Sequence, residues 1–252
     1  EPSIDDAVRV ALEQGATRII GLPVYPLCGP TTTVAALAAL AAAVEQQSLS
    51  AAVWEVSGWH RHPAYIEFRA QLIRETAAHA GISLDDPRVH LVFSAHGTPL
   101  KYLREGSRYE EYVVDCCKAV ATAAGASTYT IGYQNHSNRP LEWTQPAVDS
   151  VIDGIDADHV VVDAVSFMHE QSETLAELDH ELREHAEKRS LAFHRVPIDH
   201  DAPAFISVLA DLVSPFLERN VDVLSTSPLQ PCQCRCTPGT YCLNAGARTR
   251  TS

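Results

Sequence analysis

The sequence has 252 residues, of which 46% are hydrophobic and 20% charged, and these proportions exclude a disordered or fibrous chain. Its 19 basic and 32 acidic residues give a formal net charge of −13, which argues against a nucleic acid or an anionic membrane as an electrostatic partner. The longest apolar run, Val34 to Val44, is too short to cross a bilayer as a helix.

Hydrophobic spacing and turn residues predict helices and strands that alternate along the chain. In chain order, the predicted elements are helix 4–14, strand 17–24, helix 31–47, strand 51–56, helix 63–79, strand 89–93, helix 109–124, strand 127–133, helix 145–155, strand 159–165, helix 172–190, strand 191–196 and helix 202–219. This alternation predicts βαβ units and a largely parallel sheet.

In open parallel sheets, ligands bind beyond the carboxyl ends of the strands. This rule selects four segments for closer inspection, which are residues 25–33, 96–100, 134–143 and 167–173. The sequence contains neither a GxGxxG motif nor a Walker loop, so we do not expect a dinucleotide or a nucleoside triphosphate as ligand.

His96 follows an apolar strand and precedes Gly97, so its imidazole is expected at a strand tip beside a tight turn. A neutral histidine there can accept a proton or bind a metal near pH 7, and the alternative is a purely structural hydrogen bond. Glu170 and Glu173 flank the start of the predicted helix 172–190. They are either capping carboxylates or a pair that faces the same crevice as His96 and moves protons or guides a cation.

Three further groups of side chains allow a structural or a functional interpretation. Trp143 either offers a flat face to a planar ligand or anchors the core. His60 and His62 flank Arg61 ahead of a helix, and we predict that they are solvated. Cys116 and Cys117 lie on the apolar face of helix 109–124 and are predicted to be core residues.

Four of the seven cysteines lie close together near the end of the sequence, at Cys232, Cys234, Cys236 and Cys242. A disulfide framework would spread cysteines through a small secreted domain. Four thiolates suit an iron–sulfur cluster or a zinc site, and the spacing differs from the repeated C-x2-C pairs of zinc fingers. The pattern favours an iron–sulfur cluster, and unligated cysteines are the alternative.

Read in order, four segments resemble the ferrochelatase family. They are Gly21-Leu22-Pro23-Val24-Tyr25-Pro26, then Phe93-Ser94-Ala95-His96-Gly97-Thr98-Pro99, then Tyr133-Gln134 followed by Glu142-Trp143 and Pro146, and finally Glu173-Thr174-Leu175-Ala176-Glu177-Leu178-Asp179. The resemblance implies two Rossmann-like parallel-sheet lobes of the chelatase type, with the first lobe incomplete. Residues 1–90 would be the remainder of the first lobe, residues 91–220 the second lobe, and residues 221–252 a cysteine-rich, cluster-binding tail. Because the opening hundred or so residues of the family are absent, we expect an N-terminally truncated sequence.

The resemblance also implies roles for individual residues. His96 and Glu173 would be catalytic and would bind the ferrous substrate ion. The porphyrin substrate would contact Tyr25, Trp143, Phe167 and Glu170. The sequence departs from the family at Gln171, where a histidine is usual, and in the polar loop 135–140. His136 in this loop is a candidate to replace a lost polar contact.

The implied function is a lyase that inserts Fe²⁺ into protoporphyrin IX or coproporphyrin III in haem biosynthesis. An accessory [2Fe–2S] cluster would be held either by Cys28 with three terminal cysteines, for which we favour Cys234, Cys236 and Cys242 and keep Cys232 as a candidate, or by the terminal four alone. We expect a cytoplasmic protein without a transmembrane segment or a nucleic-acid partner. Peripheral membrane contact, and monomer versus homodimer, stay open. The alternatives are a chelatase for another tetrapyrrole or metal and a non-catalytic porphyrin- or cluster-binding protein.

Overall fold

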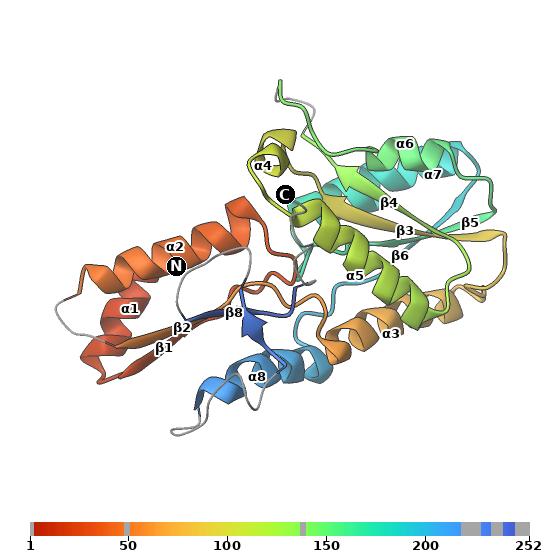
Figure 1. The fold of residues 1–252 in the computed structure, drawn as a ribbon. Coiled ribbons are helices and arrows are strands. Elements are labelled where there is room, and N and C mark those ends of the chain that lie inside the picture. Colours follow the sequence, from red (N-terminus) through yellow and green to blue (C-terminus); the bar gives the residue numbers. More distant parts are fainter. Residues whose placement is uncertain (1–2, 48–50, 137–139, 218–227, 233–238, 245–252) are drawn as a thin grey trace, which may run out of the picture. The chain divides into compact units, whose positions relative to one another are not determined.

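The computed structural model of the chain describes residues 3–47, 51–136, 140–217, 228–232 and 239–244. The chain divides into two compact units, one formed by Glu1–His60 with Ser207–Ser252 and the other by Arg61–Ile206. Each unit contains a β-sheet flanked by helices, which confirms the predicted α/β class (Figure 1). Helix α8 (Pro203–Leu217) runs from the second unit into the first.

The first unit has a four-stranded sheet in the order β1-β2-β8-β7. The strands are β1 (Arg18–Gly21), β2 (Ala52–Val56), β7 (Gln230–Pro231) and β8 (Thr240–Cys242). Strands β1 and β8 both pair in parallel with β2, while β7 is antiparallel to β8. The helices are α1 (Ile4–Glu13), η1 (Pro30–Val34) and α2 (Ala35–Glu45), and Val8 and Leu12 of α1 pack with Leu40 and Ala43 of α2.

The second unit has a four-stranded sheet in the order β4-β3-β5-β6, and every strand pairing in it is parallel. The strands are β3 (Val89–His96), β4 (Tyr129–Gln134), β5 (His159–Asp163) and β6 (Ala192–Arg195). The chain passes from β3 to β4 on one side and then crosses to β5 on the other side of β3. In a parallel sheet such a reversal opens a crevice at the carboxyl ends of the strands.

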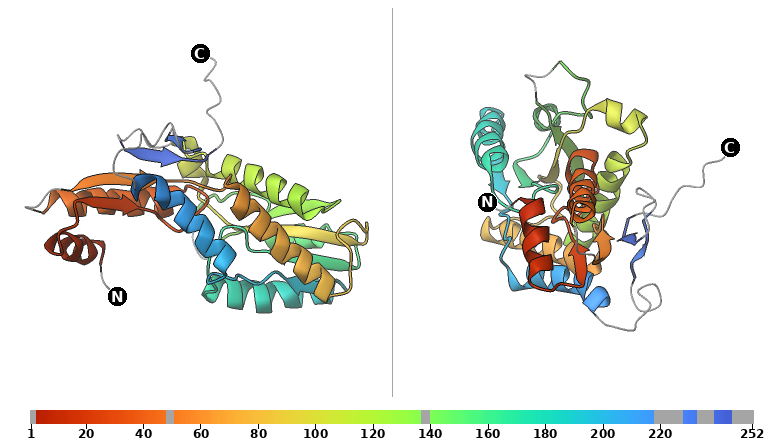
Figure 2. Two further views of the ribbon diagram at one scale, coloured as in Figure 1. Left: turned by 90° about the horizontal axis from the view of Figure 1, so that it is seen from below. Right: turned by 90° about the vertical axis from the view of Figure 1, so that its left-hand side faces the viewer.

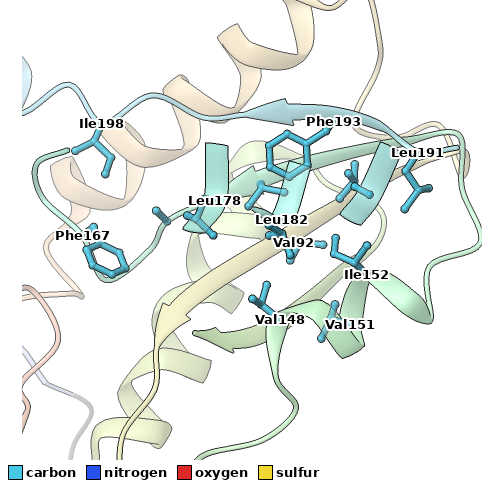
Figure 3. Close-up of a cluster of buried hydrophobic side chains, with 14 residues drawn as sticks. Val92, Val148, Val151, Ile152, Phe167, Leu178, Leu182, Leu191, Phe193 and Ile198 are labelled. Atoms are coloured by element: carbon cyan, nitrogen blue, oxygen red, sulfur yellow. The ribbon is translucent and has the colours of Figure 1, made fainter. Parts of the chain in front are cut away.

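The helices of the second unit cover both faces of its sheet. They are α3 (Pro63–His79), α4 (Leu100–Arg104), α5 (Tyr109–Ala124), α6 (Val148–Asp153), η2 (Glu173–Leu182) and α7 (Arg183–Lys188). Helices α3 and α5 pack together on one face, and α6 lies with η2 and α7 on the other (Figure 2). On this second face, Val92 and Val162 of the strands pack against Ile152, Leu178 and Leu182 (Figure 3). Alternate strand residues therefore supply the two cores, as parallel sheets buried on both faces require.

Two of the predicted helices each consist of two different helical forms. Residues 30–34 and 173–182 adopt π-helices, η1 and η2, which continue as the α-helices α2 and α7. A π-helix closes its hydrogen bonds between residues i and i+5, is rare, and occurs frequently at functional sites. Short α4, β7 and β8 were not among the predicted elements. The other predicted elements occur with bounds that differ by a few residues.

The compact units have bounds that differ from the predicted domain limits at residues 90 and 220. Helix α3 belongs to the second unit because it packs against α5 and because the guanidinium of Arg69 donates to the carboxylate of Asp163 on β5. Both side chains are buried, so this ion pair is shielded from water and fixes α3 to the sheet. Residues 240–242 of the predicted tail form β8 and belong to the first sheet.

The predicted solvation of His60 and His62 is wrong, since 0% of His60 and 8% of His62 is exposed. Cys116 and Cys117 are fully buried, as predicted, and burial raises the pKa of the Cys116 thiol to about 12. Among the helices in the described part of the chain, none combines the length and apolarity needed to cross a bilayer.

Candidate active site

The candidate site lies at the carboxyl edge of the second sheet. His96 is the last residue of β3 and pairs in register with Gln134, the last residue of β4. Glu173 begins η2, the helix that follows β5. Three consecutive strand–helix connections therefore deliver polar side chains to one edge, as the strand-end rule predicts.

The imidazole of His96 has a defined orientation. Its Nδ1 lies 2.8 Å from the carbonyl oxygen of Gly97, and its Nε2 lies 3.2 Å from Oε1 of Glu173. A carbonyl only accepts hydrogen bonds, so Nδ1 carries the hydrogen, and in the neutral ring Nε2 presents its lone pair to the carboxylate. Two acceptors then face each other, and this contact is favourable when a proton or a metal cation lies between them.

The backbone around His96 is also held in place. Its amide donates to Ser166 Oγ at 2.7 Å, and its carbonyl accepts from the hydroxyl of Tyr109 at 3.1 Å. About a third of the His96 side chain is exposed, so a solute can reach the ring. The site thus combines a fixed ring with access from outside the unit.

Two glutamines position Glu173 and its helix. Nε2 of Gln171 donates to Oε2 of Glu173 at 2.8 Å, which leaves Oε1 directed at the histidine. Nε2 of Gln134 donates to the backbone carbonyl of Glu173 at 3.1 Å and to Oε2 of Glu177 at 2.9 Å. The sequence alone assigned no role to Gln134. Two signals pointed to it: it directly follows the predicted strand 127–133, and it belongs to the Tyr133-Gln134 segment that resembles the family.

His136 approaches the same oxygen of Glu173 as His96 does. Its Nε2 is 3.9 Å from Oε1 of Glu173, and its ring centroid is 5.2 Å from that of His96. The ring of Trp143 meets His136 edge to face at a centroid distance of 5.4 Å. Both residues line a cavity of about 960 Å³ whose wall also contains Gln134, Glu177 and Glu181.

The structure gives the predicted substrate-contacting aromatic residues different environments. Trp143 is 9% exposed and forms part of the cavity wall. Phe167 is buried in the same hydrophobic cluster as Leu178 and Leu182 of η2 (Figure 3), and its ring centroid is 6.1 Å from that of His96. Tyr25 is exposed and belongs to the first unit.

Of the two interpretations offered for Glu170 and Glu173, the structure does not show the one in which both carboxylates face the same crevice as His96. Glu173 meets His96, whereas Glu170 accepts from the guanidinium of Arg195 on β6 and from the amide of Ile198 at 3.1 Å. Burial raises the pKa of Glu170, but hydrogen bonds from Thr174, Arg195 and Ile198 outweigh it and hold that pKa below the usual value. Glu170 is thus an anchoring carboxylate whose partner lies on another strand.

The cysteines of the predicted cluster lie in the first unit. Cys28, Cys232 and Cys242 are buried, and Cys232 Sγ lies 3.0 Å from the hydroxyl of Ser57. Cys234 and Cys236 lie outside the described residues. The predicted ligand set therefore stays a prediction.

Solved structures with a similar fold are chelatase proteins. SirB from Bacillus subtilis with Fe³⁺ superposes with a TM-score of 0.58 at 12% identity, covering 86% of this chain and 80% of that one. CbiX, the terminal enzyme for biosynthesis of sirohaem in denitrifying bacteria, has a TM-score of 0.55 at 16% identity and covers 82% of this chain and 80% of its own. This chain therefore has the same fold as these proteins.

Sequence comparison identifies the family of this chain. The model of the ferrochelatase family matches residues 1–217. The ferrochelatase of Trichodesmium erythraeum is 31% identical over 86% of this chain and 57% of its own length, and that of Aquifex aeolicus is 33% identical over 84% of this chain and 68% of its own. This chain belongs to the ferrochelatase family, and it spans little more than half the length of the Trichodesmium relative.

Proposed function

We propose that this protein is a ferrochelatase, a lyase that inserts Fe²⁺ into a porphyrin, either protoporphyrin IX or coproporphyrin III. The observation that carries the proposal is the pairing of His96 Nε2 with Glu173 Oε1 at the carboxyl edge of a parallel sheet in a chain of this family. A base and a carboxylate that share a proton or cation are the groups that this reaction needs.

Metal insertion replaces two pyrrole N–H protons of the porphyrin with one divalent ion. Because Nδ1 of His96 is committed to the Gly97 carbonyl, Nε2 is the nitrogen available to take one of these protons or to hold the metal, and the other proton can pass to water at the exposed side of the ring. Glu173 balances the positive charge that His96 then carries. Its second oxygen is hydrogen-bonded to Gln171, so the carboxylate keeps its orientation as the proton arrives.

In the second unit, the proposed contacts to the porphyrin are Trp143 and Phe167, and a contact from Tyr25 of the first unit stays a prediction from the sequence. Trp143 supports this assignment best, because it lines a cavity beside the His96–Glu173 pair. Phe167 lies beside the His96 ring, with the two ring centroids 6.1 Å apart. Glu170 is not among the proposed contacts, because its carboxylate accepts a hydrogen bond from the guanidinium of Arg195.

The first test is the variant His96→Ala, which removes the proposed base. We expect a loss of about 10²- to 10⁴-fold in the rate of Fe²⁺ insertion, which is the usual contribution of a positioned acid–base group, with porphyrin binding retained. Insertion is followed without oxygen by the change in the porphyrin absorption spectrum, and binding by quenching of porphyrin fluorescence. Glu173→Gln is expected to cause a loss of similar size because it removes the charge but keeps the shape.

His79→Ala is the matched control, since this exposed histidine on α3 forms its hydrogen bond with the carbonyl of Glu75 in its own helix, away from the candidate site. The control should insert iron at the rate of the unaltered protein. Unchanged insertion by His96→Ala would overturn the proposal.

The same assay separates the alternative chelatase reactions. Protoporphyrin IX, coproporphyrin III and sirohydrochlorin are compared as substrates with Fe²⁺ and Co²⁺. Turnover of sirohydrochlorin alone would favour a chelatase for another tetrapyrrole. Porphyrin binding without turnover of any substrate would favour a non-catalytic binding protein.

We further propose that cysteines of the first unit hold a [2Fe–2S] cluster. Support comes from the burial of Cys28, Cys232 and Cys242, since a cluster that is shielded from water needs buried thiolate ligands. Cys234 and Cys236 complete the candidate set. When bound, such a cluster would supply a redox-active iron centre. The cytoplasmic location and the choice between monomer and homodimer stay predictions from the sequence.

A further inference from the structure

The three ligand atoms His96 Nε2, His136 Nε2 and Glu173 Oε1 lie close enough to share one metal ion. All three atoms lie within 4.8 Å of one another. Within the described part of the chain, no other three His, Cys, Asp or Glu residues bring their ligand atoms this close together. Ligand atoms about 2.1 Å from a tetrahedral ion are about 3.4 Å apart. Oε1 of Glu173 is 3.2 Å from Nε2 of His96 and 3.9 Å from Nε2 of His136, so these two separations lie within about half an ångström of that value.

We infer that His136 is a third protein ligand for the substrate metal, so that the site binds a divalent transition-metal ion before any tetrapyrrole is present. This inference rests on the proposed function for the role of the ion as substrate. Two imidazoles and one carboxylate with open positions suit Fe²⁺, Co²⁺ and Ni²⁺. The open positions would face the incoming ring nitrogens.

The position of His136 is defined by its neighbours. The adjacent Asn135 donates from Nδ2 to the carbonyl of Thr144 at 2.9 Å, and its Oδ1 lies directly against Gly97. Thr144 in turn bonds both the amide and the carbonyl of Thr98. The start of the loop is therefore tied to the turn that orients His96, which keeps the two imidazoles at a defined separation.

The side chains around the three ligands also favour a cation at this place. Trp143 packs against the His136 ring edge to face and limits its rotation. Gln171 donates to Oε2 of Glu173, so Oε1 is the oxygen left to face both histidines. About a third of each imidazole is exposed, which allows an ion to enter from solvent.

The test is a titration of the purified chain with Co²⁺ in the absence of porphyrin, read by the visible d–d absorption and by calorimetry. We expect one ion per chain at this site. His136→Ala should weaken its binding by at least the 10- to 100-fold that loss of even an outer-shell partner commonly costs. Co²⁺ bound to cysteines is recognised by sulfur-to-metal charge-transfer bands in the near ultraviolet and is subtracted.

His79→Ala again serves as the matched control and should bind Co²⁺ like the unaltered protein. In the insertion assay, His136→Ala should raise the KM for Fe²⁺ more than it lowers kcat. Equal Co²⁺ affinity in the unaltered protein and His136→Ala would overturn the inference, even if insertion proves correct. Co²⁺ binding that depends on His136 in a protein without insertion activity would instead overturn the proposed function and leave the metal site standing.

Discussion

Gly97 allows a close approach of two chain segments in the candidate site. Gly97 follows His96, and its amide donates to the carbonyl of Gln134 at 2.7 Å. A Cβ at this position would lie 1.9 Å from Asn135 Oδ1 and 2.7 Å from the Gln134 carbonyl oxygen. Only glycine allows the ends of β3 and β4 to approach this closely, and this approach brings the loop with His136 near His96.

We therefore expect Gly97→Ala to displace the end of β4 together with Gln134 and His136. The overpacking should cost about 1–3 kcal/mol of the free energy of unfolding and should lower the insertion rate about tenfold or more. Urea denaturation and the insertion assay measure the two effects. Gly154→Ala is the control, because a Cβ there makes only ordinary contacts. Equal losses in both variants would show that the approach of the strands is not required.

At the scale of the helix, the chemistry depends on how η2 is attached to the sheet. Helix η2 adopts the rare π form, and side chains outside it hold it to the sheet. Arg195 on β6 supplies this support, since its guanidinium donates to Glu170 ahead of η2 and to Asp179 Oδ1 within η2 at 3.0 Å. Glu173 lies between Glu170 and Asp179 in the sequence, so these two ion pairs fix the segment that carries it.

Replacing Arg195 with methionine should release both carboxylates. Because the Arg195 side chain is only 7% exposed, we expect a loss on the order of 2 kcal/mol in the free energy of unfolding at neutral pH. The folded-state pKa of Glu170 is lowered, so its contribution is fully present above the unfolded pKa and is lost as the pH falls through the folded value. The two proteins should therefore converge in stability as the pH falls below about 4.

Urea denaturation between about pH 7 and pH 3 measures this convergence. Arg88→Met serves as the control, because the Arg88 side chain is 70% exposed and its pairing with Asp86 is a surface contact. A constant difference between Arg195→Met and the unaltered protein across this range would contradict the assignment.

At the scale of the whole molecule, the two units contain different candidate sites. The second unit contains the His96–Glu173 site, and the first contains Cys28, Cys232 and Cys242. If these cysteines hold a [2Fe–2S] cluster, protein purified without oxygen should be coloured and should contain iron and acid-labile sulfide. Cys28→Ser and Cys242→Ser should lose both, whereas Cys116→Ala, which alters a core cysteine of the second unit, should keep them. A colourless, iron-free preparation would exclude the cluster.

The alternation of helices and strands followed from the sequence, because burial on both faces of a parallel sheet leaves a regular apolar pattern. The π-helical form of residues 173–182 did not follow from the sequence, since the apolar spacing there predicts a helix and not which residues its backbone hydrogen bonds join. Strands β7 and β8 are two and three residues long, too short for any pattern.

Within the candidate site, the sequence by itself determined that His96 and Glu173 lie at the ends of secondary-structure elements, because strand ends and helix starts have local signatures. Their contact, the separation of Glu170 from Glu173 and the approach of His136 were decided only by the tertiary structure. Each of them depends on a partner far away in the chain, such as Arg195 for Glu170. The burial of His60 was decided in the same way, because a local pattern records which residues can be buried but not which surfaces will cover them.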